Sequence, residues 1–153
     1  MDNSNVFKTK NLEINDENVA VILDETTRNW FNKNSYTFFE PTKDDFIEID
    51  EIIEKGIEKG KFDFLKEPEL TIIKKYYRQY ICYTDEKNQR IIRINAFCRN
   101  LQTPIEVNGK TGWEPFDWRN NLVVVNDGGK CYWTAIINLS TKEFIDITVN
   151  GEA

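Results

Sequence analysis

The sequence contains no histidine, and this absence removes most of the familiar catalytic arrangements. Ser-His-Asp and Cys-His catalysis, imidazole metal sites and the commonest general base at neutral pH all depend on that side chain. Any catalysis would have to use carboxylates, lysines or tyrosines. We therefore expect no catalytic residue, no cofactor and no metal ion, and we favour a non-enzyme.

Cysteine is scarce. Cys82, Cys98 and Cys131 form an odd-numbered set without Cys-x-x-Cys spacing. All three lie in apolar runs that resemble strands, where cysteine acts as a small hydrophobic residue. The sequence therefore predicts reduced core cysteines, with no disulfide and no structural zinc.

Long apolar runs are also missing. The longest, Val19 to Leu23, is far shorter than the ~18 residues that suggest a membrane span. The segment from Met1 to Leu12 is polar and lacks the apolar core of a signal peptide. These observations predict a cytoplasmic protein with no membrane association.

Positive charge is outnumbered, with 20 Lys and Arg against 26 Asp and Glu, so the formal net charge is −6. Such a molecule repels phosphate backbones and anionic membrane surfaces. We therefore expect no nucleic-acid partner and favour a basic protein partner, such as a toxin domain. The alternative is that a modest negative charge only keeps the protein dispersed in water. The sequence also allows a homodimer.

Apolar residues are plentiful: 40% are hydrophobic and 13% are aromatic, which is too much apolar surface for a disordered chain. A length of 153 residues matches one ordinary domain. We expect a single domain over residues 1–153, with a loosely ordered start at 1–18 and a helix-plus-sheet core over 42–149.

The clearest element is a helix that follows Pro41. Thr42 and Asp45 have the spacing of a capping box, and Gly60 is placed for a C-cap. Apolar residues then recur at helical spacing: Phe46, Ile49, Ile53 and Ile57. This pattern predicts an amphipathic helix from Thr42 to Lys59. Its acidic set is expected to be solvated: Asp44, Asp45, Glu48 and Glu51.

Strand patterns follow the helix. Tyr76–Thr84 and Ile91–Cys98 are typical of a hairpin, and the glycines of 126–129 predict a second hairpin between Leu122–Val125 and Cys131–Leu139. Phe144–Val149 alternates like a last strand. Before the helix, Val19–Leu23 is either a strand or the first turn of a helix; we favour the helix. That helix would continue through Thr26, Thr27, Trp30 and Phe31.

The predicted sheet is apolar on both faces. Alternation puts Ile92, Ile94, Ala96 and Cys98 on one side and Ile91 and Phe97 on the other, whereas one helix covers only one face. The tyrosines and tryptophans, with Arg78 and Arg93, are residue types enriched at interfaces. Alternatively, the N-terminal segment through Trp30 and Phe38-Phe39 covers this face.

Between the two hairpins lies the long segment from Arg99 to Asn121, which contains prolines, glycines, Trp113 and Trp118. Long loops of this kind are often functional. We predict a partner-binding surface composed of Trp113, Trp118, Tyr76, Tyr80 and Tyr132. The alternative is that the aromatic residues fold back as a lid over one end of the sheet.

The predicted fold class is α+β, with one long amphipathic helix packed on a curved antiparallel sheet of four or more strands. From Thr42 to Val149 this order of elements resembles the cystatin-like roll. The inhibitory Q-x-V-x-G loop is absent, since Gln102–Glu106 departs from it, so cysteine-protease inhibition is not implied. The D-G-G-x-C-aromatic segment at 127–132 and the V-N-G-x-A terminus are similar to those of small uncharacterised bacterial proteins.

Two functions remain open. The first is a non-catalytic protein-binding module, by analogy with immunity or inhibitor proteins that neutralise a bacterial toxin. The second is a small-ligand-binding or enzymatic roll with a pocket between helix and sheet, lined by Phe46, Tyr83 and Trp133. A buried carboxylate in an enclosed pocket favours the enzyme, while a filled core with an exposed aromatic patch favours the binding module.

Overall fold

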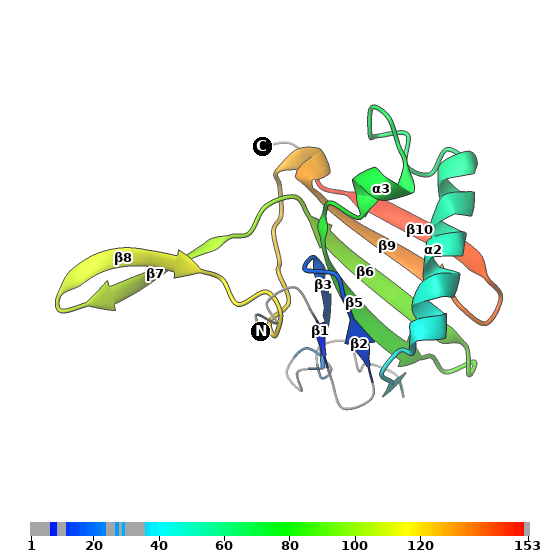
Figure 1. The fold of residues 1–153 in the computed structure, drawn as a ribbon, viewed down its shortest axis with the longest axis horizontal. Helices are drawn as coiled ribbons and strands as arrows, with labels where there is room; N and C mark the ends of the chain where they lie inside the picture. Colours follow the sequence, from blue (N-terminus) through cyan, green and yellow to red (C-terminus); the bar gives the residue numbers. More distant parts are fainter. Residues whose placement is uncertain (1–6, 9–11, 24–26, 28, 30–35, 152–153) are drawn as a thin grey trace.

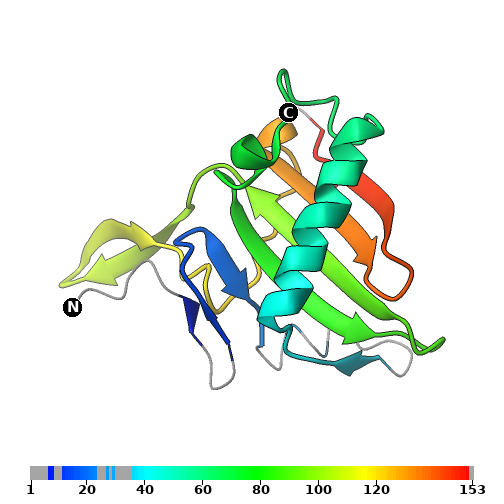
Figure 2. The same ribbon diagram turned by 45° about the vertical axis from the view of Figure 1, so that its right-hand side comes forward.

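A six-stranded mixed sheet with a long helix across one face forms the body of the protein (Figures 1 and 2). The computed structural model describes residues 7–8, 12–23, 27, 29 and 36–151. The strand order is β10-β9-β6-β5-β3. Strand β4 lies on the same edge of β5 as β3: β3 pairs with the first half of β5, and β4 pairs with its last two residues. The strands are β3 (Val19–Val21), β4 (Thr37–Phe38), β5 (Tyr77–Thr84), β6 (Arg90–Phe97), β9 (Tyr132–Asn138) and β10 (Glu143–Val149).

Four of these strands, β5, β6, β9 and β10, form an antiparallel meander, while β3 pairs with β5 in parallel. The predicted α+β class, the first hairpin and the last strand are therefore confirmed. The sheet is mixed rather than purely antiparallel because of β3. The remaining elements are β1 (Phe7–Lys8), β2 (Glu13–Ile14), β7 (Gln102–Val107), β8 (Lys110–Pro115), α2 (Lys43–Glu58), α3 (Leu70–Ile73) and the 3₁₀ turn η1 (Gly129–Cys131). No described helix is both long and apolar enough to cross a bilayer.

Helix α2 begins and ends where its capping residues predict. The Thr42 side chain accepts a hydrogen bond from the Asp45 N–H, and the Asp45 carboxylate accepts one from the Thr42 N–H. At the other end the N–H of Gly60 bonds to Ile57 O and that of Lys61 to Gly56 O. This pair of bonds is a Schellman motif, and Gly60 adopts the positive φ of 80° that it needs.

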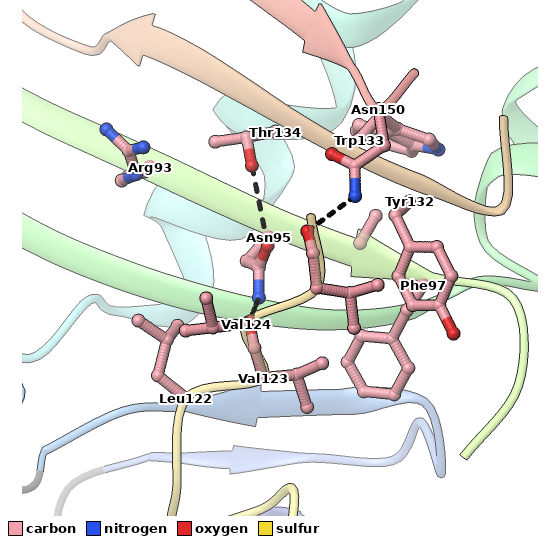
Figure 3. A pocket seen from close by; sticks show the side chains of 12 residues that line it. Arg93, Asn95, Phe97, Leu122, Val123, Val124, Tyr132, Trp133, Thr134 and Asn150 are labelled. Carbon is pink, nitrogen blue, oxygen red and sulfur yellow. Dashed lines mark hydrogen bonds between the residues drawn. The ribbon is translucent and has the colours of Figure 1, made fainter. Parts of the chain in front are cut away.

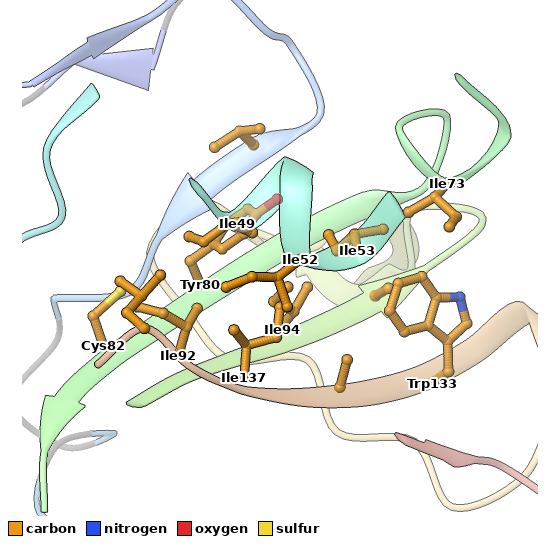
Figure 4. Packing of buried hydrophobic residues seen from close by; sticks show 14 of the residues in the cluster. Ile49, Ile52, Ile53, Ile73, Tyr80, Cys82, Ile92, Ile94, Trp133 and Ile137 are labelled. Carbon is orange, nitrogen blue, oxygen red and sulfur yellow. The ribbon is translucent and has the colours of Figure 1, made fainter. Parts of the chain in front are cut away.

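The apolar stripe of α2 packs into a filled layer against the sheet. Figure 4 shows Ile49, Ile52 and Ile53 facing the sheet, and each is at most 2% exposed. Gly56 also has a packing reason, because a Cβ atom there would lie 3.0 Å from the Phe144 ring. Its missing side chain lets the helix approach β10 closely, which offsets the helix propensity that glycine loses.

The apolar run at Val19 is a strand, and the predicted helix there is wrong. β3 pairs with Arg78–Tyr80 of β5, and its side chains alternate between the two faces of the sheet. A short continuous apolar run is typical of a strand that is buried on both faces. Of the residues through which the helix was expected to continue, Thr27 is helical, whereas Thr26, Trp30 and Phe31 lie outside the described part of the chain.

The predicted second hairpin is also wrong, because Leu122–Val125 is not a strand. The Val123 N–H and C=O bond to the side chains of Gln79 and Asn95 instead of to a neighbouring backbone. The glycines that suggested a hairpin turn lead into η1. A chain segment can thus satisfy its backbone groups on a sheet face without joining the sheet.

Cys98 and Cys131 form a disulfide, which corrects the prediction of three reduced cysteines. Phe97 and Tyr132 are paired across β6 and β9, so the next residues along, the two cysteines, lie opposite each other. The Cys98 N–H also bonds to Cys131 O, at 2.9 Å. Cys82 remains a free, buried core residue, and burial raises the pKa of its thiol well above the ordinary value.

The disulfide should be the main covalent constraint on the segment between β6 and β9. Its partners are 33 residues apart, and in the chain-entropy view closing such a loop stabilises the fold by about 3–4 kcal/mol. The double change Cys98→Ser and Cys131→Ser should lower the free energy of unfolding by about that amount, measured by urea titration. Thiol titration of the unreduced, denatured chain should give one thiol; three thiols would contradict the assignment.

Candidate functional site

The segment predicted as a long loop is a β-hairpin arm that projects from the body (Figures 1 and 2). Its strands β7 and β8 pair with each other from Gln102↔Pro115 to Val107↔Lys110. Asn108 and Gly109 form the turn, with φ values of 52° and 76°. Asn-Gly between alternating residues is the strongest short signal for such a turn, and this signal was available in the sequence.

The pairing gives the arm two different faces. We define the tryptophan face as the side that carries Gln102, Pro104, Glu106, Thr111, Trp113 and Pro115, because paired residues share a face. The opposite face carries Ile105, Val107 and Glu114. The Trp113 side chain is 67% exposed, which makes it the most exposed large apolar residue in the described part of the chain.

The arm's edges are poorly suited to pair with another strand. In a two-residue hairpin the closing pair is hydrogen-bonded, and the pairs then alternate. Pro104 and Pro115 therefore lie in pairs that are not hydrogen-bonded within the arm, where the backbone nitrogens point away from the partner strand. One proline nitrogen thus faces outward on each edge of the arm. Proline has no N–H to offer there, so each edge lacks one of its outward donors and pairs less well with another strand. A face of the arm is therefore better suited than an edge to contact a partner.

After the arm, residues 116–125 return across the face of the sheet that lies opposite α2; we call this segment the strap. Trp118 is only 7% exposed, and its ring contacts Tyr77 and Phe97 at centroid distances of 5.1 Å and 5.8 Å. Val123 is buried beside them. The lid interpretation is thus confirmed for the strap, while the arm before it is separate.

Two side-chain amides, one buried and one partly buried, hold the strap on the sheet. The Gln79 side chain is fully buried, and its nitrogen donates to the carbonyls of Trp118 (2.6 Å) and Asn121 (2.7 Å). Its oxygen accepts from the Val123 N–H, at 2.9 Å. Asn95 donates both to this same oxygen and to Val123 O, at 2.9 and 2.8 Å. Because a buried polar group without a partner is costly, this network fixes one position for the strap.

The rest of the second face is covered by segments that precede α2. Ile22 and Phe38 pack against Ile81 and Ile91 of the sheet, and Tyr36 stacks on Tyr83 at 4.6 Å. The prediction of a sheet with two apolar faces is therefore confirmed. Of the segment expected to cover it, Phe38 does so, Phe39 packs with the helix-side core, and Trp30 lies outside the described residues.

The five residues predicted to contact a partner do not form one surface. Tyr80 is 1% exposed beneath α2, with its ring 4.9 Å from Phe46. Tyr76 lies on the same side, and its hydroxyl donates to Lys130 O. Trp118 and Tyr132 share the core of the second face, each 7% exposed. Trp113 alone of the five offers a large exposed ring.

A small groove lies between the strap and strands β6 and β9, with a volume of about 130 Å³. Val124 on the strap is 64% exposed beside it. Figure 3 shows Asn95 between Thr134 and the strap. Arg93 is the one charged residue among those that line this strap groove. The other lining side chains that Figure 3 labels are Phe97, Leu122, Val123, Tyr132, Trp133 and Asn150.

The pocket expected between helix and sheet is filled by side chains. Phe46 packs against Tyr80, and Trp133 packs against Phe62 at 5.5 Å. Tyr83 lies on the opposite face of the sheet. Among the described residues there is no group of three acidic or cysteine side chains placed to hold a metal ion.

The acidic set of α2 contains one buried member, which corrects its reading as four solvated charges. Asp45 is 6% exposed, and both of its oxygens accept from the Arg90 guanidinium, at 3.1 and 2.8 Å. Burial would raise the pKa of Asp45, but the bonds from Arg90 and the Thr42 N–H outweigh it and lower the pKa. This carboxylate ties the helix to β6 and is not placed for chemistry.

Arg78, considered above as an interface residue, belongs to the interior. It is 2% exposed and forms an ion pair with Asp16 at 2.6 Å. Its guanidinium also donates to the Tyr80 hydroxyl and to the backbone carbonyls of Tyr76 and Lys74. A buried arginine with this many partners is structural, since losing any one of them would leave a charge poorly compensated.

Comparison of the chain with protein-family models, curated proteins and solved structures gave no match. The described part of the chain has a filled core between helix and sheet, a projecting arm with an exposed tryptophan, and the strap groove on the sheet face opposite α2. The buried carboxylate of Asp45 is engaged in an ion pair with Arg90.

The lowered pKa of Asp45 makes its contribution to stability depend on pH. The pKa of Asp45 in the folded state lies below its unfolded value of about 3.9. The stabilisation that the Asp45 carboxylate provides is therefore complete at pH values above the unfolded pKa, and it is lost as the pH falls through the folded-state pKa. Asp45→Asn should lower the free energy of unfolding by about 1–2 kcal/mol at pH 7. The difference from the native chain should shrink below about pH 4.

The matched control for this measurement is Glu54→Gln, at an exposed position of the same helix. It should have little effect at any pH. A cost for Asp45→Asn that is the same at pH 7 and pH 3 would contradict the ion pair as its source.

Proposed function

We propose that this chain is a non-catalytic protein-binding module whose contact surface is the tryptophan face of the arm. The observation that carries the proposal is Trp113, which is 67% exposed on a hairpin that projects from the body. Large exposed aromatic residues are costly to leave in water and are enriched among the residues that dominate binding energy.

The arm has the build of a contact element. A two-stranded hairpin alone is at best marginally stable in water, so packing its face against a partner would stabilise it. Its base is held by the disulfide on one side and by the strap on the other. A fixed base lowers the ordering cost of binding, which is where a preorganised surface gains affinity.

The enzymatic or small-ligand alternative has less support. The strap groove, at about 130 Å³, is smaller than the roughly 300–1,000 Å³ typical of ligand pockets. The buried carboxylate of Asp45 is paired with Arg90 rather than aimed into an open space. Neither observation meets the criterion for the enzyme, which is a buried carboxylate that points into an enclosed pocket.

We extend the proposal to the type of partner and to the architecture. The order of α2 followed by the meander agrees with a cystatin-like roll, and an acidic chain with net charge −6 would attract a basic protein. An immunity or inhibitor protein that neutralises a basic toxin domain has these properties. This part of the proposal is an analogy of type.

We also propose an oxidising compartment in place of the predicted cytoplasm. Disulfides persist in secreted and periplasmic proteins and are rare where thiols are kept reduced. Cys98 is exposed, so reductants in a cytoplasm would reach the bond. The disulfide therefore supports an extracytoplasmic location.

Site-specific photo-crosslinking tests the proposal. A photoreactive phenylalanine derivative, which keeps an aromatic ring at the position, replaces Trp113 in one variant and Ile47, which is 58% exposed on α2, in a control variant. In extract from the native cells, a discrete adduct should form at position 113 and not at position 47. Excess native chain should compete for the adduct, whereas excess Trp113→Ala should compete at least ~30-fold less well. Equal labelling at both positions, or equal competition by both chains, would contradict the proposal.

A further inference from the structure

We infer that the tryptophan face of the arm binds an arginine side chain of the partner protein, with the guanidinium lying on the Trp113 ring and bonded to the Glu106 carboxylate. This inference rests on the proposed function, because it names the chemical group that the same surface recognises. It commits to one residue type on the partner and to two contacts on this chain.

A single charged side chain accompanies Trp113 on the tryptophan face. Glu106 pairs with Thr111, and Trp113 pairs with Pro104, so Glu106 lies diagonal to Trp113. Diagonal neighbours in a hairpin are about 7–8 Å apart, which is within reach of aromatic and long side chains. The other members of this face carry no charge: Gln102, Pro104, Thr111 and Pro115. The face therefore presents an aromatic ring beside one carboxylate.

Neither group is engaged within the described part of the chain. Trp113 is 67% exposed, and Glu106 is exposed as well. Among the described residues, no ion pair involves Glu106 and no arginine lies over the Trp113 ring. Lys110, the one basic residue of β7 and β8, lies on the opposite face because it pairs with Val107. The ring and the carboxylate are thus both open to a cation from another molecule.

The chain holds a guanidinium in this manner at another place. The Arg90 guanidinium lies over the Phe39 ring, 4.6 Å from its centroid. The same group donates to both oxygens of the Asp45 carboxylate, at 3.1 and 2.8 Å. A ring and a carboxylate together therefore bind one arginine. Trp113 and Glu106 offer the same two kinds of group on the arm.

Arginine fits this pair better than lysine does. A guanidinium is planar and weakly hydrated, so it can stack on an indole and still direct its N–H groups at a carboxylate. Arg119 shows the first of these contacts, 5.1 Å from the centroid of the Trp118 ring. A lysine ammonium is a compact and strongly hydrated charge. The apolar stem of an arginine can also lie on Pro104, directly opposite Trp113.

Charge complementarity favours this occupant at long and at short range. The net charge of −6 attracts a basic partner before contact. In the contact, a cation compensates the Glu106 carboxylate as water leaves the face. An acidic or purely apolar side chain would leave that carboxylate without a partner, which is costly when water is excluded.

Titration of the full chain with small peptides tests the inference. The probes are blocked glycine peptides with one central residue, which is arginine, lysine or citrulline, the uncharged analogue of arginine. The readout is the indole N–H signal of Trp113 in NMR spectra, identified by its loss in Trp113→Phe. The arginine peptide should shift this signal with a Kd of about 10 mM, and the other two peptides should bind at least ~3-fold more weakly. The signals of Trp118 and Trp133, which are buried, should not move.

Two matched variants separate the local contact from the overall charge. Glu106→Gln and Glu114→Gln each remove one negative charge, at exposed positions on opposite faces of the arm. Glu106→Gln should weaken binding of the arginine peptide about 2–5-fold, whereas Glu114→Gln should leave it unaltered. Urea titration should show that both variants are as stable as the native chain.

The inference is wrong if arginine binds no better than citrulline or lysine, or if the two glutamate variants behave alike. An unmoved Trp113 signal would reject it too. Photo-crosslinking keeps these failures distinct from failure of the proposed function. A discrete adduct at position 113 without a preference for arginine would retain the proposed function and reject the arginine contact. The absence of a discrete adduct would reject the proposed function, and the partner's arginine with it.

Discussion

The structure depends on one constraint, which is that both faces of the β5–β6–β9 sheet are apolar and both must be covered. Helix α2 covers one face with Ile49, Ile52 and Ile53, whose burial is almost complete. The other face needs a second cover, and the strap and the segments before α2 supply it. The strap is not a strand of the sheet, so its backbone groups bond to the side chains of Gln79, which is buried, and Asn95, which is partly buried.

The arm follows from this arrangement. The chain leaves β6 at Cys98, must cross the second face, and re-enters the sheet after Cys131, where the disulfide joins the two points. Residues 116–125 are sufficient to make the crossing, so the hairpin of β7 and β8 is not needed to cover the core. A proline in each edge and an exposed tryptophan on a segment that the core does not need support the proposal that the arm contacts another surface.

The helix and the two-faced sheet could be predicted because their signals are local: Thr42 and Asp45 mark the cap, and strand alternation shows two apolar sets. The disulfide could not, since it depends on the register of β6 against β9, two strands that are distant in sequence. Trp113 and Trp118 lie five residues apart in the same predicted loop, yet one is exposed and the other is buried, because tertiary packing places the strap on the sheet and leaves the arm away from it. The turn at Asn108 and Gly109 was signalled locally, so the hairpin of the arm could have been predicted from the sequence.

The most direct measurement is to excise the arm, replacing residues 102–115 by two glycines while keeping the disulfide and the strap. The account predicts that the shortened chain unfolds at nearly the same urea midpoint, within about 1 kcal/mol of the native chain, and no longer competes for the adduct formed at position 113. A loss of several kcal/mol on excision would show that the arm is part of the folded core. Intact binding by the shortened chain would show that the contact surface lies elsewhere.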